Sequence, residues 1–152
     1  MPTIAPSYIY AFFALVAVSS ILISSFAAYA ASLRTLPEMR QLQNLLNRVA
    51  AKSCELITLT TTTNSSSEAV LKLPSTIGNK HYWIRLHNET SKAWVEGVFS
   101  SMGLGDSAPR VYIPNFVFPS GNHSSAYGPA ILECYMNGST VKLHLESWRD
   151  SV

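Results

Sequence analysis

Charged residues are scarce in this chain of 152 residues, where Asp, Glu, Lys and Arg make up 13%, about half the usual share. None of them occurs between Met1 and Leu33. The chain has 11 basic and 9 acidic residues and no basic run, so the electrostatic footprint of a nucleic-acid-binding protein is missing. We therefore predict no nucleic-acid partner, and a chain of this length has room for one domain plus an appendage.

Cysteine is also scarce, since only Cys54 and Cys134 occur. They lack the CxxC or His/Cys spacing of a zinc site. In a reducing compartment they would be two small buried thiols. In an oxidising compartment they would close a loop of roughly 80 residues, worth about 4 to 5 kcal/mol by chain entropy. The sequence leaves both alternatives open and predicts no metal site.

Catalytic motifs are missing as well. The histidines His81, His87, His123 and His144 are scattered, with no HExxH or GxSxG pattern, and no two carboxylates stand close together in the sequence. The glycines at residues 103–106 are not followed by the lysine and helix of a phosphate-binding loop. We therefore expect no enzymatic activity and no cofactor.

A long hydrophobic run fills the region without charge. Residues 8–33 read YIYAFFALVAVSSILISSFAAYAASL, which as a helix measures about 39 Å against a hydrocarbon core of about 30 Å. Ala28-Tyr29-Ala30 fits a signal-peptidase pattern, but the run is too long for a secretory signal and no basic residue precedes it. We interpret it as a single membrane-spanning helix with tyrosines near both ends.

Small residues form a stripe along this helix. Ser20, Ser24 and Ala28 follow one another at intervals of four, and Ala17 and Ala31 lie close to the same row. Such a stripe allows the backbones of neighbouring helices to approach closely. The alternative is the ordinary tolerance of Ala and Ser in an apolar helix. The stripe is our hypothesis for self-association.

Beyond the apolar run the helical pattern becomes amphipathic. Thr35-Leu36-Pro37-Glu38 has the form of a capping box, and leucines at helical spacing continue to about Ile57. We predict a helix over residues 1–57, bent or restarted near Pro37, whose second part packs on a β domain. The Thr/Ser-rich tract that follows predicts an extended linker over residues 58–69.

After this tract the hydrophobic period changes to two, which is typical of strands. The predicted strands cover residues 70–73, 82–86, 93–99, 110–113, 130–136 and 140–145. Asn137-Gly138 between the last two is a strong hairpin signal. Six short strands at this spacing predict an Ig-like antiparallel β-sandwich over residues 70–152, and with the helix an α+β fold. Phe116-Val117-Phe118 predicts either an exposed apolar knob or a plug packed on the sandwich.

Four Asn-x-Ser/Thr sequons, at Asn64, Asn88, Asn122 and Asn137, fall in predicted loops or turns. They indicate an N-glycosylated extracellular surface, although Asn137 also suits its hairpin turn. The first basic residues follow the apolar helix, and the positive-inside rule alone would keep the β domain in the cytoplasm. That rule is weak for long translocated domains, so the sequons lead us to place the domain outside.

In this order of elements the chain resembles archaeal type IV pilin-like proteins, the group of pilins, archaellins and archaellum stator subunits. The run LP-x-x-IG-x-x-Y-x-I carries the closest local match, through Leu73, Pro74, Ile77, Gly78, Tyr82 and Ile84. The resemblance implies a filament in which copies of the N-terminal helix bundle in the core and glycosylated β domains form the wall. Before assembly the subunit would reside in the membrane.

A departure from the family favours an alternative. Family precursors carry a short basic leader before the hydrophobic helix, and residues 1–7 contain neither Lys nor Arg. Either a leader precedes the numbered sequence, or the protein is never processed. The second case raises the alternative of a membrane-anchored extracytoplasmic binding protein or stator-like protein. Surface-layer or host-surface contacts are further candidate interactions under either interpretation.

Overall fold

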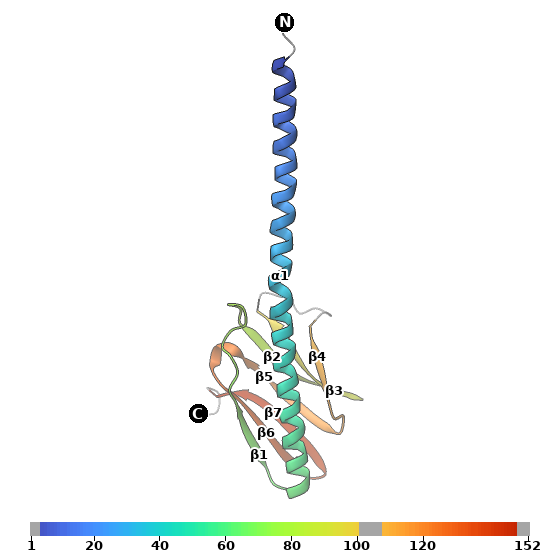
Figure 1. Cartoon of the computed structure of the whole chain (residues 1–152). Coiled ribbons are helices and arrows are strands. Elements are labelled where there is room, and N and C mark those ends of the chain that lie inside the picture. Colours follow the sequence, from blue (N-terminus) through green and yellow to red (C-terminus); the bar gives the residue numbers. More distant parts are fainter. Residues whose placement is uncertain (1–3, 101–107, 149–152) are drawn as a thin grey trace. The chain divides into compact units, whose positions relative to one another are not determined.

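The computed structural model describes residues 4–100 and 108–148. One helix, α1 (Ile4–Thr63), precedes a sheet of seven strands (Figure 1). The chain divides within α1 into two compact units, Met1–Pro37 and Glu38–Val152. The helix is continuous through Pro37, so no second helix starts there. A proline removes one backbone donor, and a helix can continue past that loss.

The sheet has the strand order β1-β6-β7-β5-β2-β3-β4. Its strands are β1 (Ser67–Leu71), β2 (Tyr82–Glu89), β3 (Lys92–Phe99), β4 (Arg110–Ile113), β5 (Val117–Ser124), β6 (Ala130–Asn137) and β7 (Thr140–Ser147), with a short 3₁₀ helix, η1 (Ser125–Tyr127), after β5. Every paired neighbour is antiparallel except β5 and β7, which are parallel. The predicted α+β class is confirmed.

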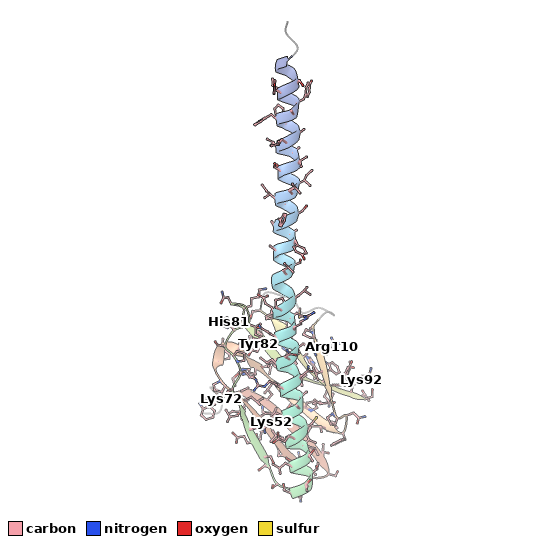
Figure 2. The ribbon with its side chains drawn as sticks, viewed as in Figure 1. Lys52, Lys72, His81, Tyr82, Lys92 and Arg110 are labelled. Atoms are coloured by element: carbon pink, nitrogen blue, oxygen red, sulfur yellow. The ribbon has the colours of Figure 1, made fainter. Side chains whose placement is uncertain are left out.

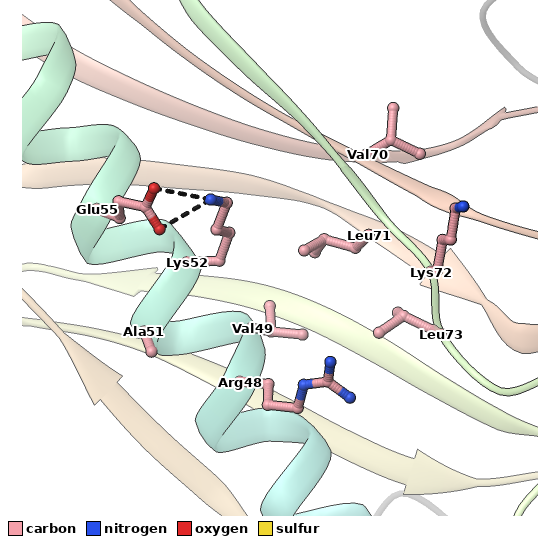
Figure 3. A pocket seen from close by; sticks show the side chains of 9 residues that line it. All are labelled: Arg48, Val49, Ala51, Lys52, Glu55, Val70, Leu71, Lys72 and Leu73. Atoms are coloured by element: carbon pink, nitrogen blue, oxygen red, sulfur yellow. Dashed lines mark hydrogen bonds and ion pairs between the residues drawn. The ribbon is translucent and has the colours of Figure 1, made fainter.

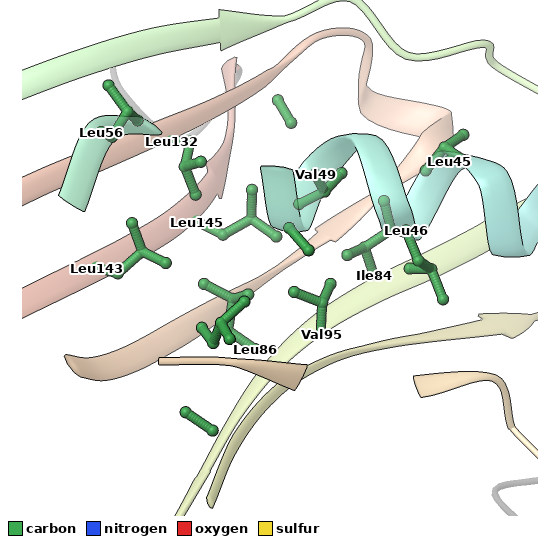
Figure 4. Packing of buried hydrophobic residues seen from close by; sticks show 14 of the residues in the cluster. Leu45, Leu46, Val49, Leu56, Ile84, Leu86, Val95, Leu132, Leu143 and Leu145 are labelled. Atoms are coloured by element: carbon green, nitrogen blue, oxygen red, sulfur yellow. The ribbon is translucent and has the colours of Figure 1, made fainter. Parts of the chain in front are cut away.

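The core of the second unit lies between the later part of α1 and one face of the sheet (Figure 4). The helix contributes its leucine stripe at helical spacing, and the strands contribute alternate residues, as their period of two requires. The central members are Leu42, Leu45, Leu46, Val49 and Leu56 from α1, and Ile84, Leu86, Val95, Leu132, Leu143 and Leu145 from the strands. The predicted sandwich packing is not confirmed, because the layer over the inner face of the sheet is this helix.

The Thr/Ser tract corrects our prediction of a linker over residues 58–69. The helix continues to Thr63, and β1 begins at Ser67. Threonine hydroxyls along this tract donate to the backbone carbonyl four residues earlier, as Thr62 does to Thr58. Thr60 is fully buried and donates to the Cys134 carbonyl across the domain at 3.3 Å. Tertiary packing therefore extends a helix that low propensity alone would have ended.

β5 is the strand that our sequence analysis missed. Its first part, Val117–Gly121, pairs with β7, and the registered pairs with β2 begin only at Asn122. Pro119, which lacks an N–H, therefore lies where the strand needs a partner on one side only. Gly121 has φ +100°, and a side chain there would collide with the Leu145 carbonyl oxygen. This close contact between β5 and β7 lies at the point where β5 changes its pairing from β7 to β2.

The hairpin and the aromatic segment have separate outcomes. Asn137 pairs with Thr140, and Gly138 adopts φ +64°, so the predicted hairpin is confirmed. Phe116 and Phe118 are 57% and 52% exposed, which favours the knob over the plug.

Candidate functional site

The apolar segment of the first unit is exposed along its whole length. Between Tyr8 and Leu33, fourteen large apolar side chains are exposed, and the most apolar 18-residue window has a mean hydropathy of 2.2 with none of its residues buried (Figure 2). At about 1.5 to 3 kcal/mol for each side chain, covering them is worth roughly 20 to 40 kcal/mol. Water is therefore a poor solvent for this segment, and lipid or other protein has to cover it.

Several serine hydroxyls of this segment are satisfied within the helix. Ser19, Ser20 and Ser24 donate to the carbonyls of Leu15, Val16 and Ser20 at 2.7, 2.8 and 2.7 Å. A hydroxyl bonded in this way can enter lipid or a dry helix bundle without leaving a donor unpaired.

The predicted packing stripe forms a narrow face of the helix. At 3.6 residues per turn, its members fall within about 80° of one another around the axis. They are Ala17, Ser20, Ser24, Ala28 and Ala31, and all five are exposed. The geometry therefore offers one smooth strip along which a second helix could approach closely.

All four sequon asparagines lie at the surface of the second unit, as N-glycosylation would require. Asn64 follows the end of α1 with φ 51°, outside the strands. Our placement of Asn88 and Asn122 in loops is wrong, because they lie in β2 and β5, whereas Asn137 is the last residue of β6, at the hairpin turn where we predicted it. Asn88 and Asn137 are near the ends of their strands, whereas Asn122 lies within the central strand of the sheet.

The sequon at Asn122 differs from the others in its hydroxyl residue. Ser124 is 4% exposed, and its side chain accepts a hydrogen bond from the Ala126 N–H at 3.4 Å. The corresponding Ser66, Thr90 and Ser139 are exposed. A transferase acting on the folded chain would therefore find three accessible sequons and one whose hydroxyl is held inside.

The disulfide that we left open is not formed, and both thiols are free. Cys134 is buried in the core, and burial raises the pKa of its thiol. The helix residue that reaches the backbone of Cys134 is Thr60. Cys54 lies six residues earlier, about 9 Å along the helix axis. The register of the helix on the sheet therefore brings a threonine hydroxyl to this position in place of the second sulfur.

The residues that carry the family resemblance have a structural role. The Tyr82 hydroxyl, with its pKa raised to about 12 by burial, donates to the Pro74 carbonyl. Gly78 has φ +56°, and a side chain there would collide with the Glu38 carboxylate. That carboxylate accepts a hydrogen bond from Lys80 at 2.6 Å. Through these contacts, this run connects the part of α1 that packs on the sheet, near Glu38, to the loop before β2.

A polar cluster on the outer face of the sheet surrounds Trp94. His87 stacks on the indole at 5.4 Å between ring centroids, and the Arg110 guanidinium lies 5.5 Å from the ring centroid. Glu96, 7% exposed, contacts Arg110 at 3.1 Å and the His87 ring at 3.0 Å. The latter contact is close enough for an ion pair without being an aligned hydrogen bond. Sequence analysis missed this cluster because only the strand register brings its members together.

A serine and a histidine also meet on this face. Ser120 Oγ lies 3.0 Å from His144 Nδ1, and His144 Nε2 lies 3.9 Å from Glu146. A serine nucleophile needs a base and a site that excludes water. Ser120 is exposed and the His144 side chain is 41% exposed, so we regard the pair as a surface contact. Within residues 4–100 and 108–148, no group of three His, Cys, Asp or Glu side chains is placed to hold a metal ion.

Compared with models of protein families, curated proteins and solved structures, the chain matches none. The resemblance to pilin-like proteins therefore rests on the quoted residues and the order of elements.

Proposed function

We propose that this protein is a structural subunit of an archaeal type IV pilus-like extracellular filament. The observation that carries the proposal is the uncharged helix of residues 8–33, whose large apolar side chains are exposed and in which the hydroxyls of Ser19, Ser20 and Ser24 need no outside partner. A bundle of such helices would bury the exposed apolar surface among copies of the same chain.

The small-residue stripe supports the same proposal. A solitary anchor in lipid needs apolar side chains but no smooth face. Close packing of helices needs small residues on one side, and Ser20, Ser24 and Ala28 provide them over two successive intervals of four. A filament further requires contacts that do not close into a ring, so that copies add without limit.

The second unit would form the outer wall of the filament. Its four surface asparagines are candidates for N-glycosylation, which agrees with a domain on the outer side of the membrane. In this assembly the partners are copies of the chain, the membrane before assembly, and surface-layer or host-surface molecules outside.

The second candidate is a single-pass membrane anchor for an extracytoplasmic binding or stator-like domain. The observation that favours it is the length of the apolar run, which is sufficient to cross a bilayer without any partner. Here the helix would remain in lipid, and the sheet domain would bind another component of the cell surface.

A matched pair of substitutions separates the two. Ser24→Leu adds bulk to the stripe, whereas Ser19→Leu adds the same bulk about 140° away around the helix. Both serine hydroxyls donate to the backbone carbonyl four residues earlier, so each variant loses an equivalent hydrogen bond. We expect that cells with the Ser24→Leu variant release no filaments when sheared, although the variant still inserts into the membrane. The Ser19→Leu variant should still assemble into filaments. Normal filaments from Ser24→Leu would overturn the packing argument, and detergent-dependent release of the wild type would support the anchor.

A further inference from the structure

A groove runs along one edge of the second unit, between α1 and β1 (Figure 3). It has a volume of about 480 Å³. Apolar side chains line its inner part, among them Val49, Leu71 and Leu73. β1 is the edge strand of the sheet and pairs only with β6, so its outer edge is open along the groove. Open strand edges next to apolar surface are sites where another chain can dock.

The rim of this groove is positively charged. Arg48, Lys52 and Lys72 surround it, together with the single carboxylate of Glu55. Lys52 is paired with that carboxylate at 2.8 Å. Arg48 and Lys72 have no ion-pair partner among the residues that the structure describes. Two cations at the rim are therefore available to an acidic partner.

The same unit has an acidic patch on the outer face of the sheet, formed by Glu68, Glu133 and Glu146. Glu68 of β1 and Glu133 of β6 are directly opposite each other in the ladder, where like charges are destabilising. Neither has an ion-pair partner in the described part of the chain, and Glu146 lies 3.9 Å from His144. His144 stands opposite Glu133, and Lys142 lies on the same face of β7, but neither forms an ion pair with Glu68 or Glu133. An external cation would therefore still stabilise this pair of carboxylates.

The other carboxylates of the described second unit are accounted for. Glu38 pairs with Lys80, Glu55 with Lys52, and Glu96 with Arg110. Glu89 stands opposite Lys92 across the β2–β3 hairpin. Among the described residues, the carboxylates without an ion-pair partner are thus concentrated at one place. Arg40, Arg85 and Lys142 also lack an ion-pair partner, but of the unpaired cations only Arg48 and Lys72 line the groove.

We propose that the basic groove of one copy binds the acidic patch of the next copy. The proposal rests on the filament function proposed above and specifies the contact between neighbouring sheet domains. The two surfaces adjoin at β1, where Glu68 lies on the same face as the groove-lining Val70. The acidic patch extends from there across β6 and β7 through Glu133 and Glu146, away from the groove. A contact between two distinct surfaces is head-to-tail and can propagate without closing. Opposite charges on the two surfaces set the register and disfavour groove-to-groove pairing.

The test is a charge swap on the full-length chain in membrane vesicles. Unlabelled and ¹⁵N-labelled copies are mixed and treated with a carbodiimide, which joins Lys to Glu without a spacer, and mass spectrometry detects mixed-isotope peptide pairs. We expect pairs that join Lys52 or Lys72 to Glu68 or Glu133. The yield is counted on the pairs through Lys52, whose amine every variant keeps. Arg48→Glu with Lys72→Glu should lower this yield roughly tenfold or more, because like charges then face each other.

The rescue and the control decide the outcome. Adding Glu68→Lys with Glu133→Lys to the reversed groove should restore mixed-isotope pairs, now formed with the charges exchanged. Arg40→Glu reverses an exposed basic residue of α1 that does not line the groove and has no ion-pair partner among the described residues, and it should leave the yield unchanged. The neutral variant Lys72→Gln should lower the yield less than the charge reversal does, which guards against a folding defect. Tryptophan fluorescence checks that each variant is folded. Wild-type pairs that are absent, insensitive to reversal or not restored by the swap would overturn the inference.

The sheared fraction of the same cells separates this inference from the filament proposal. Filaments that form equally well with reversed and native groove charges would overturn the inference and leave the filament function standing. Charge-dependent pairs from a wild type that never leaves the membrane would support the contact and overturn the filament.

Discussion

Gly97 of β3 lies against the leucines of α1. A methyl group added there would lie 3.0 Å from Leu46 Cδ2 and 3.1 Å from Leu42 Cδ1. Replacing Gly97 by Ala restricts the conformations of the unfolded chain, which stabilises the folded protein by about 0.4 to 1 kcal/mol. The overpacked methyl costs about 1 to 3 kcal/mol. We expect a net loss of roughly 1 to 2 kcal/mol in the free energy of unfolding.

The partner substitution makes the test specific. Leu46 is fully buried, so Leu46→Ala alone should cost about 2 to 5 kcal/mol and leave a cavity beside Gly97. In the double variant the new methyl enters this space, so the combined loss should be smaller than the sum by about 1 kcal/mol or more. Leu143 is equally buried but lies on β7, three strands from β3 and about 14 Å away, so Leu143→Ala should add independently to Gly97→Ala.

The assay is urea unfolding of the full-length chain in detergent micelles, followed by tryptophan fluorescence. All three tryptophans, Trp83, Trp94 and Trp148, belong to the second unit, so the signal reports that unit alone. If Gly97→Ala is stabilising and adds independently to Leu46→Ala, the helix does not cover β3 as described.

Three further outcomes are expected. If glycans are transferred to the folded chain, Asn122 should show the lowest occupancy of the four sequons by glycopeptide mass spectrometry, because its serine hydroxyl is held inside; equal occupancy would show that transfer precedes folding. His123 is fully buried, and burial lowers its pKa below 6.5. As the pH falls, the unfolded chain therefore binds a proton at His123 before the folded chain does. The contribution of neutral His123 to the free energy of unfolding is fully present above pH 6.5 and should be lost as the pH drops below that value. His123→Gln should flatten the decline in urea-unfolding free energy between about pH 7 and 5, whereas exposed His81→Gln should not; identical slopes for all three proteins would refute a role for His123. Cys54 should react with a thiol reagent in the native chain and Cys134 only on unfolding; two unreactive thiols and a mass lower by two hydrogens would instead reveal the disulfide.

The elements that were predictable are those with local signals. The uncharged run, the leucine stripe and the Asn137-Gly138 turn each follow from spacing within one segment, and each lies where that spacing puts it. The α+β class follows from the same patterns. The exposure of the sequon asparagines was predicted from their placement in loops or turns, but Asn122 is exposed because of its position in β5, while His123 and Ser124 of the same sequon are buried.

The elements that were missed depend on contacts distant in sequence. The composition of β5, VFPSGNHS, is typical of a loop, and only its position between β7 and β2 makes it a strand. Thr60 extends α1 because a carbonyl 74 residues away accepts its hydroxyl. The basic groove and the acidic patch arise from the helix register and from strand pairs such as Glu68 with Glu133. A single sequence does not show which strands pair.

The measurement that tests the central proposal most directly is the location of the protein after cells are sheared. Released material is collected and analysed by mass spectrometry and electron microscopy. If the protein is a filament subunit, it should be the main component of thin filaments, with residues 8–33 intact. A protein that remains with the membrane and is released only by detergent would contradict the filament and identify an anchored accessory protein.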